Sequence, residues 1–213
     1  MTFLNEAMIS DIKKKLSDMK DPVKILFFKP KDGCQFCDQI EQIASEVKNI
    51  NPKLSAEIII FDPNNPLAKE YEVDAAPVIV LRGKEKCFVR FYGLPTGYEF
   101  PTFISDILDV SKGAPSIDPS LAENIKKIDF PVHMRVFVTP TCPYCAGAVK
   151  VAHDFALLNP NIKGDMVESM EFRDLAEKYN VMGVPKTVIN DKIELAGAYP
   201  ADIVLKKILE LKK

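Results

Sequence analysis

The sequence predicts an α/β protein of two tandem domains that arose by internal duplication, each with a mixed central sheet flanked by helices. A Cys-x-x-Cys motif occurs twice, as Cys34–Cys37 and Cys142–Cys145, at an offset of 108 residues (142 − 34). The same offset relates identical residues further along: Leu67, Ala68, Tyr71, Val73 and Pro77 match Leu175, Ala176, Tyr179, Val181 and Pro185. Two unrelated motifs would not keep this register, which indicates a duplicated domain.

Each half opens with a strand that leads directly into its cysteine motif. The apolar run at 23–28 suits a buried strand, and apolar residues alternate with polar ones at 132–138. Behind each motif, side chains at spacings of 3, 4 and 3 fall on one face of a helix. These residues are Cys37, Ile40, Ala44 and Val47 in the first half and Cys145, Ala148, Ala152 and Phe155 in the second.

A second strand, a short helix, a pair of strands joined by a turn and a terminal helix follow in both halves, and one further helix precedes each half. In the first half we expect the second strand at 56–61, the short helix up to Tyr71, and the strand pair from Pro77 with its turn at 83–84. The terminal helix runs through Phe103 to Val110, and the extra helix lies near 5–19. In the second half we expect the second strand near 166–170, the short helix up to Tyr179, and the strand pair from Pro185 with its turn at 190–191. The terminal helix runs through Ile203 to Leu211, and the extra helix lies near 118–128.

The boundary between the halves is predicted between 112 and 119. Gly113, Pro115 and Pro119 interrupt helical periodicity there, as is typical of a linker. We therefore divide the chain into an N-terminal domain at 1–114, which carries Cys-Gln-Phe-Cys, and a C-terminal domain at 115–213, which carries Cys-Pro-Tyr-Cys.

Composition excludes several classes of function. Lys and Arg number 28 against 30 Asp and Glu, so there is no basic excess to bind nucleic acid or an anionic membrane. No stretch resembles a signal peptide or reaches the roughly 18 apolar residues that span a bilayer, so we expect a cytoplasmic protein. Because thiols are mostly kept reduced in the cytoplasm, paired cysteines there indicate metal binding or redox chemistry.

Two cysteines at the start of a helix suit thiol–disulfide exchange. The thiolate is the nucleophile, and the unpaired N–H groups and positive dipole end of a helix N-terminus favour the anion. Cys34 and Cys142 are thus the predicted attacking thiols. A sulfur three residues later lies close enough to resolve a mixed disulfide, which is the role predicted for Cys37 and Cys145.

Less reactive interpretations of the cysteines compete with redox chemistry. A single Cys₄ zinc site is disfavoured because 104 residues separate Cys37 from Cys142, against the usual ~15–20. Inert structural disulfides are disfavoured by the expected compartment. The unpaired Cys87 is interpreted as a half-buried residue of a strand at 86–92, and His133 and His153 are interpreted as structural residues.

The motifs resemble a known family. The order strand, Cys-x-x-Cys, helix, strand, helix, proline, hairpin and helix is that of the thioredoxin fold, and Pro77 and Pro185 occupy the position of its cis-proline. Cys-Pro-Tyr-Cys is also the glutaredoxin active-site tetrapeptide. Two such units in 213 residues, both with their cysteine pair, resemble the glutaredoxin-like protein disulfide oxidoreductases of thermophilic archaea and bacteria.

The resemblance implies two tandem thioredoxin-like domains and an enzyme of cell redox homeostasis that reduces, oxidises or isomerises protein disulfides. It implies exchange at both cysteine pairs, with no metal and no cofactor beyond these redox-active disulfides. Ala76–Pro77 and Val184–Pro185 would shape the substrate-binding grooves, and we expect both prolines to follow cis bonds. Protein dithiols and disulfides would be the substrates, and a flavoenzyme of the thioredoxin-reductase type would recharge the sites.

A rival function is that of an electron-relay module, which passes electrons from a flavoprotein reductase to a peroxiredoxin-like partner. In the known tandem thioredoxin-fold module of this kind, one half has lost its Cys-x-x-Cys. Both pairs are present here, which favours the oxidoreductase.

The strand before each motif lacks the buried carboxylate that thioredoxin-like proteins often use as a proton acceptor. Leu26, Phe28, Val136 and Val138 are all apolar. Any proton relay must therefore use another group.

The two motifs also differ in ways that predict a more active C-terminal site. Pro143 follows Cys142 at a first-turn position, where its fixed φ favours helix initiation. The first motif has Gln35 there, and its loop is longer and contains Gly33.

Overall fold

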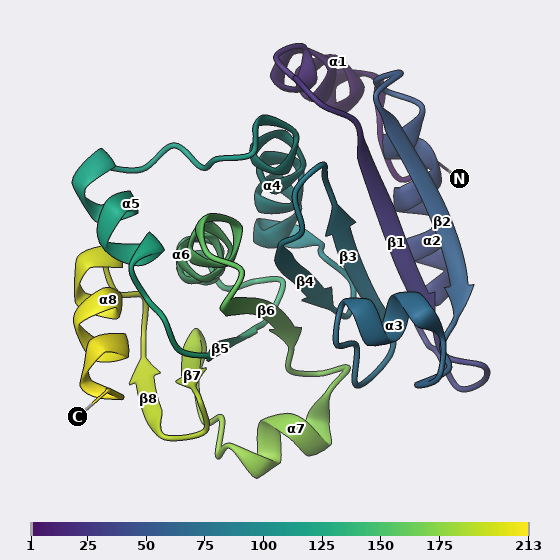
Figure 1. Cartoon of the computed structure of the whole chain (residues 1–213). Coiled ribbons are helices and arrows are strands. Elements are labelled where there is room, and N and C mark those ends of the chain that lie inside the picture. The colour runs from purple at the N-terminus through teal and green to yellow at the C-terminus, as the bar shows by residue number, and fades with distance from the viewer. Residues whose placement is uncertain (1, 213) are drawn as a thin grey trace.

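The structure is a computed structural model that describes residues 2–212, and its helices and strands follow the predicted order (Figure 1). The first half contains α1 (Glu6–Leu16), β1 (Val23–Lys29), α2 (Cys37–Lys48), β2 (Leu54–Ile60), α3 (Pro66–Glu70), β3 (Val78–Arg82), β4 (Phe88–Tyr92), the 3₁₀ turn η1 (Gly97–Glu99) and α4 (Phe100–Lys112). The second half contains α5 (Pro119–Lys126), β5 (Val132–Val138), α6 (Cys145–Leu158), β6 (Ile162–Glu168), α7 (Arg173–Lys178), β7 (Lys186–Ile189), β8 (Ile193–Ala196) and α8 (Ala201–Glu210).

The eight strands of the described chain belong to one sheet, in the order β2-β1-β3-β4-β6-β5-β7-β8. The two halves use the same pairing: β1 is parallel to β2 and antiparallel to β3, and β5 is parallel to β6 and antiparallel to β7. Parallel pairing of β4 with β6 joins the halves. The predicted α/β class with a mixed sheet is confirmed. Periodicity did not predict the pairing of β4 with β6, which joins the strands of the two halves into one sheet.

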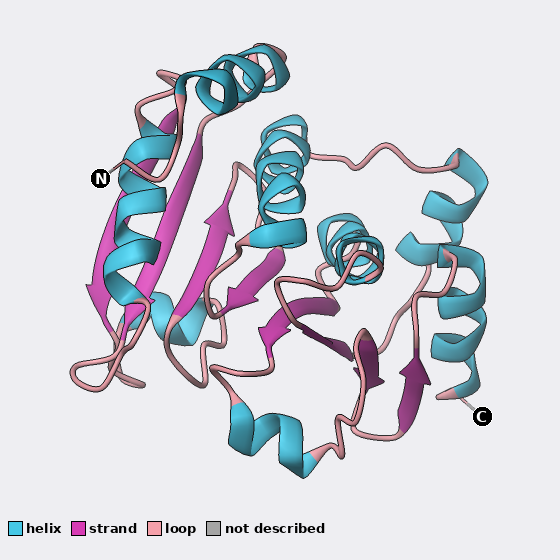
Figure 2. Ribbon diagram, turned by 180° about the vertical axis from the view of Figure 1, so that it is seen from behind, coloured by secondary structure: helices cyan, strands magenta, loops and turns pink. Residues whose placement is uncertain are grey.

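The sheet is covered on both faces, which explains the continuous apolar run of β1. Ile25 and Phe27 pack with α2 and α4 on one face, which is the near face in Figure 2. Leu26 and Phe28 pack with α3 on the other face, where α7 covers the second half. All four side chains are fully buried. A strand buried on both faces needs apolar residues at every position.

One strand lies away from its predicted place. The sequence predicts it near 166–170, whereas β6 runs from Ile162 to Glu168. The start of the strand has no apolar signature because Lys163, Gly164 and Asp165 follow Ile162. These residues are accommodated because β6 is the central strand at the joint, where Asp165 meets an arginine of β4.

The loop between α4 and α5 covers 113–118, within the predicted linker. The division into 1–114 and 115–213 stays a prediction.

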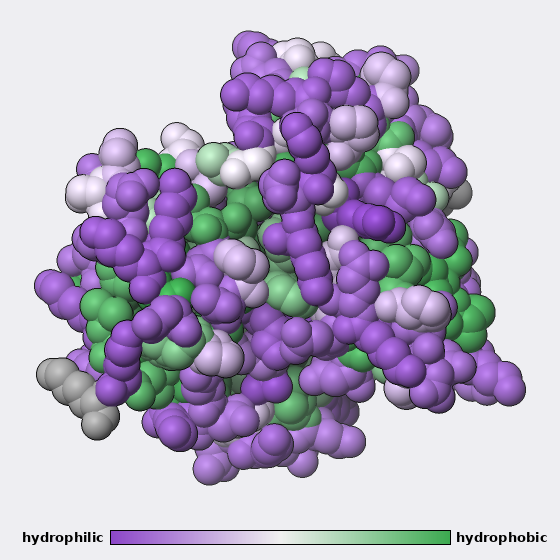
Figure 3. Space-filling model, viewed as in Figure 1, coloured by the Kyte–Doolittle hydropathy of each residue, from purple (hydrophilic) through white to green (hydrophobic). Residues whose placement is uncertain are grey.

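No helix among residues 2–212 is long and apolar enough to cross a membrane. The face seen in Figure 3 is mainly hydrophilic, and its apolar surface is divided into small patches, one of them over β2, where Ile58 and Ile60 are exposed.

Candidate active sites

Both cysteine motifs form disulfides, Cys34–Cys37 and Cys142–Cys145, each with 5.5 Å between its Cα atoms. The first lies between the carboxyl end of β1 and α2, and the second between the carboxyl end of β5 and α6. The second cysteine of each pair is fully buried, whereas Cys34 is half-buried and Cys142 is 8% exposed. The more accessible cysteine of each pair is thus the one that the sequence predicts to carry the attacking thiol.

The helices start later than the sequence predicts. α2 begins at Cys37 and α6 at Cys145, so each first cysteine lies in the turn before its helix. Pro143 therefore precedes the first turn of α6, and the prediction that it initiates this helix is wrong.

Backbone hydrogen bonds instead order the loop of the second motif. The Cys142 N–H donates to the Thr139 carbonyl (3.1 Å), and the Cys145 N–H donates to the Cys142 carbonyl (3.3 Å). Within the described residues, the loop from 30 to 37 forms no backbone bond of this kind inside itself. The second motif is therefore the more firmly held of the two, for a reason that the sequence did not show.

Both predicted cis bonds are confirmed, at Ala76–Pro77 and Val184–Pro185. Pro77 enters β3, whose Val78 pairs with Phe28 of the strand that leads to Cys34. Pro185 enters β7, whose first residue pairs with Phe137 of the strand that leads to Cys142. In each half, the strand that follows the cis-proline thus pairs with the strand that leads to the cysteine loop.

Each proline loop borders a cavity. Asp74, Ala75 and Ala76 line a cavity of about 530 Å³, whose other wall is the 170–178 segment of the second half. Met182 to Pro185 line a separate cavity of about 430 Å³. The two predicted substrate grooves therefore differ, because the first is walled by the other half of the chain.

Carboxylates removed from solvent occur where the first half meets the second, although the strand that precedes the second motif carries none. Glu99 lies in η1 and is 2% exposed, and its Oε1 finds no hydrogen-bond partner among residues 2–212. Burial raises the pKa of Glu99 to about 7, and the nearby Glu168 adds to the rise. Burial likewise raises the pKa of Glu171 to about 7, again with a contribution from Glu168.

Glu99 belongs to the first half but meets the second motif through its own turn. The Tyr98 N–H donates to the carbonyl of Pro140, two residues before Cys142 (3.2 Å). The turn also packs against α6. No local pattern in the sequence points to this carboxylate, because it is 43 residues before the cysteine and comes from the other repeat.

We expect Glu99→Gln to flatten the pH dependence of stability. The folded-state pKa of about 7 exceeds the ordinary value of 4.5, so this group favours folding most below about pH 4.5 and loses its contribution as the pH rises through about 7. The wild-type free energy of unfolding should fall by about 1–3 kcal/mol more than that of the variant across this window. Urea unfolding at pH 5 and pH 8 measures it, and the exposed Glu85→Gln is the control. A variant with the wild-type pH profile would contradict the assignment.

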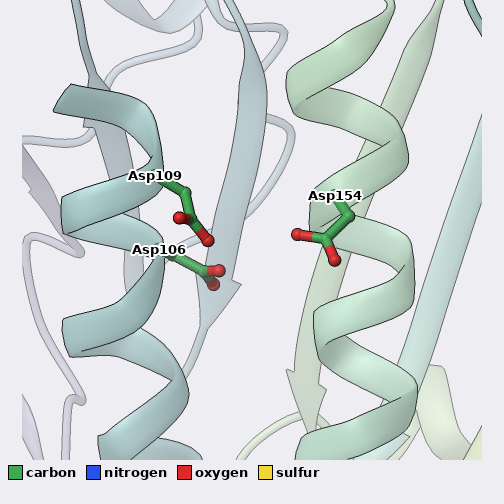
Figure 4. A group of neighbouring side chains, drawn as sticks. All are labelled: Asp106, Asp109 and Asp154. Carbon is green, nitrogen blue, oxygen red and sulfur yellow. The ribbon is translucent and has the colours of Figure 1, made fainter. Parts of the chain in front are cut away.

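A second group of acids has an internal counter-ion. Asp106 and Asp109 of α4 face Asp154 of α6, with their carboxylates turned towards one another (Figure 4). The Lys150 ammonium forms ion pairs with all three, at 3.3 Å from Asp106, 2.8 Å from Asp109 and close to Asp154. The cation of this cluster is thus supplied by the chain itself, and it links the two halves.

The residues interpreted as structural have partners that the sequence did not reveal. His133 contacts Asp165 (2.5 Å), which also accepts two hydrogen bonds from Arg90 (2.6 and 2.9 Å). His153 contacts Asp106 (2.6 Å). Cys87 lies just before β4 and is 2% exposed rather than half-buried, and burial raises the pKa of its thiol to about 12, which makes it unreactive.

The chain is similar to known redox proteins. The thioredoxin domain family matches residues 132–210. The alkyl hydroperoxide reductase component AhpF from Staphylococcus aureus is 28% identical over 193 residues, which are 90% of this chain and 37% of that protein. The same component from Staphylococcus epidermidis is 29% identical over 163 residues, 76% of this chain and 30% of that protein. The chain thus spans about a third of the length of the curated relatives it matches.

Solved structures extend the similarity to the whole fold. A protein disulfide oxidoreductase from Aeropyrum pernix K1 matches with a TM-score of 0.87 and 27% identity, over 96% of this chain and 91% of that chain. The N-terminal domain of the alkylhydroperoxide reductase AhpF from Enterococcus faecalis matches with a TM-score of 0.88 and 20% identity, over 96% and 99%, which shows a common fold. The chain is therefore a tandem thioredoxin-fold protein, similar along 96% of its length to a protein disulfide oxidoreductase, with a Cys-x-x-Cys disulfide in each half.

Proposed function

We propose that the protein is a thiol–disulfide oxidoreductase that acts on protein disulfides through both cysteine pairs. One observation carries the proposal: in each half, a Cys-x-x-Cys disulfide follows one strand, and a cis-proline loop leads into the neighbouring strand. Similarity to the Aeropyrum oxidoreductase supports it. Ala76–Pro77 and Val184–Pro185 are the proposed substrate-binding positions, since a proline at a strand start leaves neighbouring backbone groups free to pair with an extended chain.

The proposed reaction is a two-electron exchange. The Cys142 thiolate attacks one sulfur of a substrate disulfide, the substrate S–S bond breaks, and the departing sulfur takes a proton. The Cys145 thiolate then attacks the Cys142 sulfur of the mixed disulfide, which releases the second substrate thiol and leaves the Cys142–Cys145 disulfide. Cys34 and Cys37 take the same roles at the first site. A cytoplasmic flavoenzyme of the thioredoxin-reductase type is the proposed source of the electrons that restore both dithiols.

Proton transfer at the second site needs a group near the motif. The β5 side chains around it are apolar, so we propose Glu99 as the acceptor. Its burial, its unpaired Oε1 and its pKa near 7 support this role, because a group that titrates near neutral pH can both take and return a proton.

The electron-relay function is the second candidate. It is favoured by the similarity to the alkyl hydroperoxide reductase component AhpF, which extends over 90% of this chain. In this role the protein would pass electrons from a reductase to a peroxiredoxin-like partner rather than to many protein disulfides.

One experiment separates the two functions. The dithiol form of the protein is offered insulin and, separately, an oxidised peroxiredoxin of the alkyl hydroperoxide reductase type. An oxidoreductase that acts on many protein disulfides should reduce those of insulin at a rate at least about tenfold above that of free dithiothreitol at the same thiol concentration. Reduction of the peroxiredoxin alone would instead establish the relay.

A further inference from the structure

The two halves differ in the connection that follows their last strand. In the second half, β8 and α8 are separated by the four residues 197–200. In the first half, β4 and α4 are separated by the seven residues 93–99. The additional residues form η1, so this turn has no equivalent in the described part of the second half.

The extra turn touches the loop of the second disulfide. A Cβ built on Gly97 would lie 2.8 Å from the Pro140 carbonyl carbon and closer still to its oxygen, so only glycine fits between the two backbones. The Tyr98 N–H donates to the same carbonyl oxygen (3.2 Å). Gly97 also has a φ of 62°, in the left-handed region that favours glycine.

The contact is fixed on both of its sides. On the side of the first half, the Leu94 N–H donates to the half-buried carboxylate of Glu171 (2.7 Å), which ties the start of the connection to the second half. On the side of the second half, the Cys142 N–H donates to Thr139, next to Pro140. The backbone that carries the attacking sulfur is therefore braced by residues of the other repeat.

We propose that Gly97 is a positioning residue of the second disulfide site, and that this site is composite: the 97–98 backbone of the first half holds the Pro140 carbonyl and thereby the Cys142 loop. The proposal rests on the assignment of Cys142–Cys145 as an exchange site. Small displacements of a loop that holds reacting atoms change their chemistry strongly. Among residues 2–212, no backbone hydrogen bond from the second half reaches the loop at 30–37, so the two sites should respond differently to the same substitution.

Gly97→Ala tests the proposal in the full chain. The variant and the wild type are equilibrated with glutathione buffers, and the thiols are trapped and counted separately for the peptides around Cys34 and Cys142. We expect the equilibrium constant of the second disulfide with glutathione to change by about threefold or more, and that of the first to change by less than about 1.5-fold.

Gly113→Ala is the matched control. Gly113 has a similar φ of 71°, but a Cβ there would meet no atom within 4 Å, so the variant carries the backbone strain without the contact. It should leave both constants as in the wild type. Three results would overturn the proposal. The constants of Gly97→Ala are unchanged, or they change equally at both disulfides, or Gly113→Ala changes the constant of the second disulfide as much as Gly97→Ala does. Because no protein substrate is used, failure of insulin reduction would not affect this result.

Discussion

Cys142→Ser should lower the rate of insulin reduction by at least about tenfold, whereas Cys34→Ser should keep most of the activity. The sequence ranks the sites in this order through Pro143 as a helix initiator, and the structure removes that reason. It supplies another, since the Cys142 loop is held by its own backbone bonds and by the first half, while the loop before Cys34 lacks such internal bonds within the described residues. A nucleophile in a fixed position loses less freedom on the way to the transition state.

The comparison needs a third cysteine variant. Cys87→Ala changes a buried thiol that burial makes unreactive, so it should retain wild-type activity in protein that remains folded. Greater loss in Cys34→Ser than in Cys142→Ser would reverse the ranking of the sites. Near-complete loss in both would mean that a single catalytic cycle uses both disulfides.

Asp165→Ala should lower the free energy of unfolding by about 3–5 kcal/mol, which is the usual cost of removing one partner from a buried ion pair. Asp165 and Arg90 are 2% and 1% exposed, and the variant would leave the guanidinium without its charge partner. Burial opposes the charged form of Asp165, but Arg90 and then His133 overcome it and hold its pKa well below the usual range. The wild type should therefore lose this contribution only as the pH falls below about 4.

Glu57→Ala is the control for this substitution. Glu57 also forms an ion pair with a residue of the neighbouring strand, Lys24, at 3.1 Å, but its side chain is 43% exposed. Exposed pairs contribute about 1 kcal/mol or less. Urea unfolding of both variants at pH 7 measures the difference, and equal losses would show that the joint between the halves does not depend on the buried pair.

Local order was predictable because each half repeats its own pattern. The buried faces of the helices behind the motifs and the two cis bonds follow from residues near one another in sequence, such as Cys37 and Ile40 or Val184 and Pro185. The joint between the halves was not predictable in this way. Arg90 and Asp165 look like residues of a solvated face, and only the pairing of β4 with β6 places them opposite each other.

The proposed proton acceptor was missed for the same physical reason. Glu99 sits in a stretch with glycine, proline and tyrosine that is typical of a surface loop. Its burial arises because η1 packs against the second half, and no periodicity within the first half encodes that contact. The starts of α2 and α6 were also misplaced, since the spacing of apolar residues fixes a helical face but not its first residue.

The joint between β4 and β6 also bears on self-association. The strands left at the two ends of the sheet, β8 and β2, are the repeat equivalents of β4 and β6, so one molecule could add to the next head to tail. At the internal joint Arg90 is paired with Asp165. Strand register shows that Glu194 of β8 is equivalent to Arg90, because Val188 and Val80 are their respective partners at the 108-residue offset.

Glu57 of β2 is equivalent to Asp165 at the same offset. End-to-end stacking of two molecules would therefore bring Glu194 against Glu57, where the internal joint has opposite charges. Each of these carboxylates already has a lysine partner, Lys186 for Glu194 and Lys24 for Glu57, so neither end strand offers the other an opposite charge. The four-residue length of β8 also offers few hydrogen bonds to an added strand. The opposite charges paired at the internal joint thus have no counterpart between the two end strands, which removes one contribution to the growth of a filament.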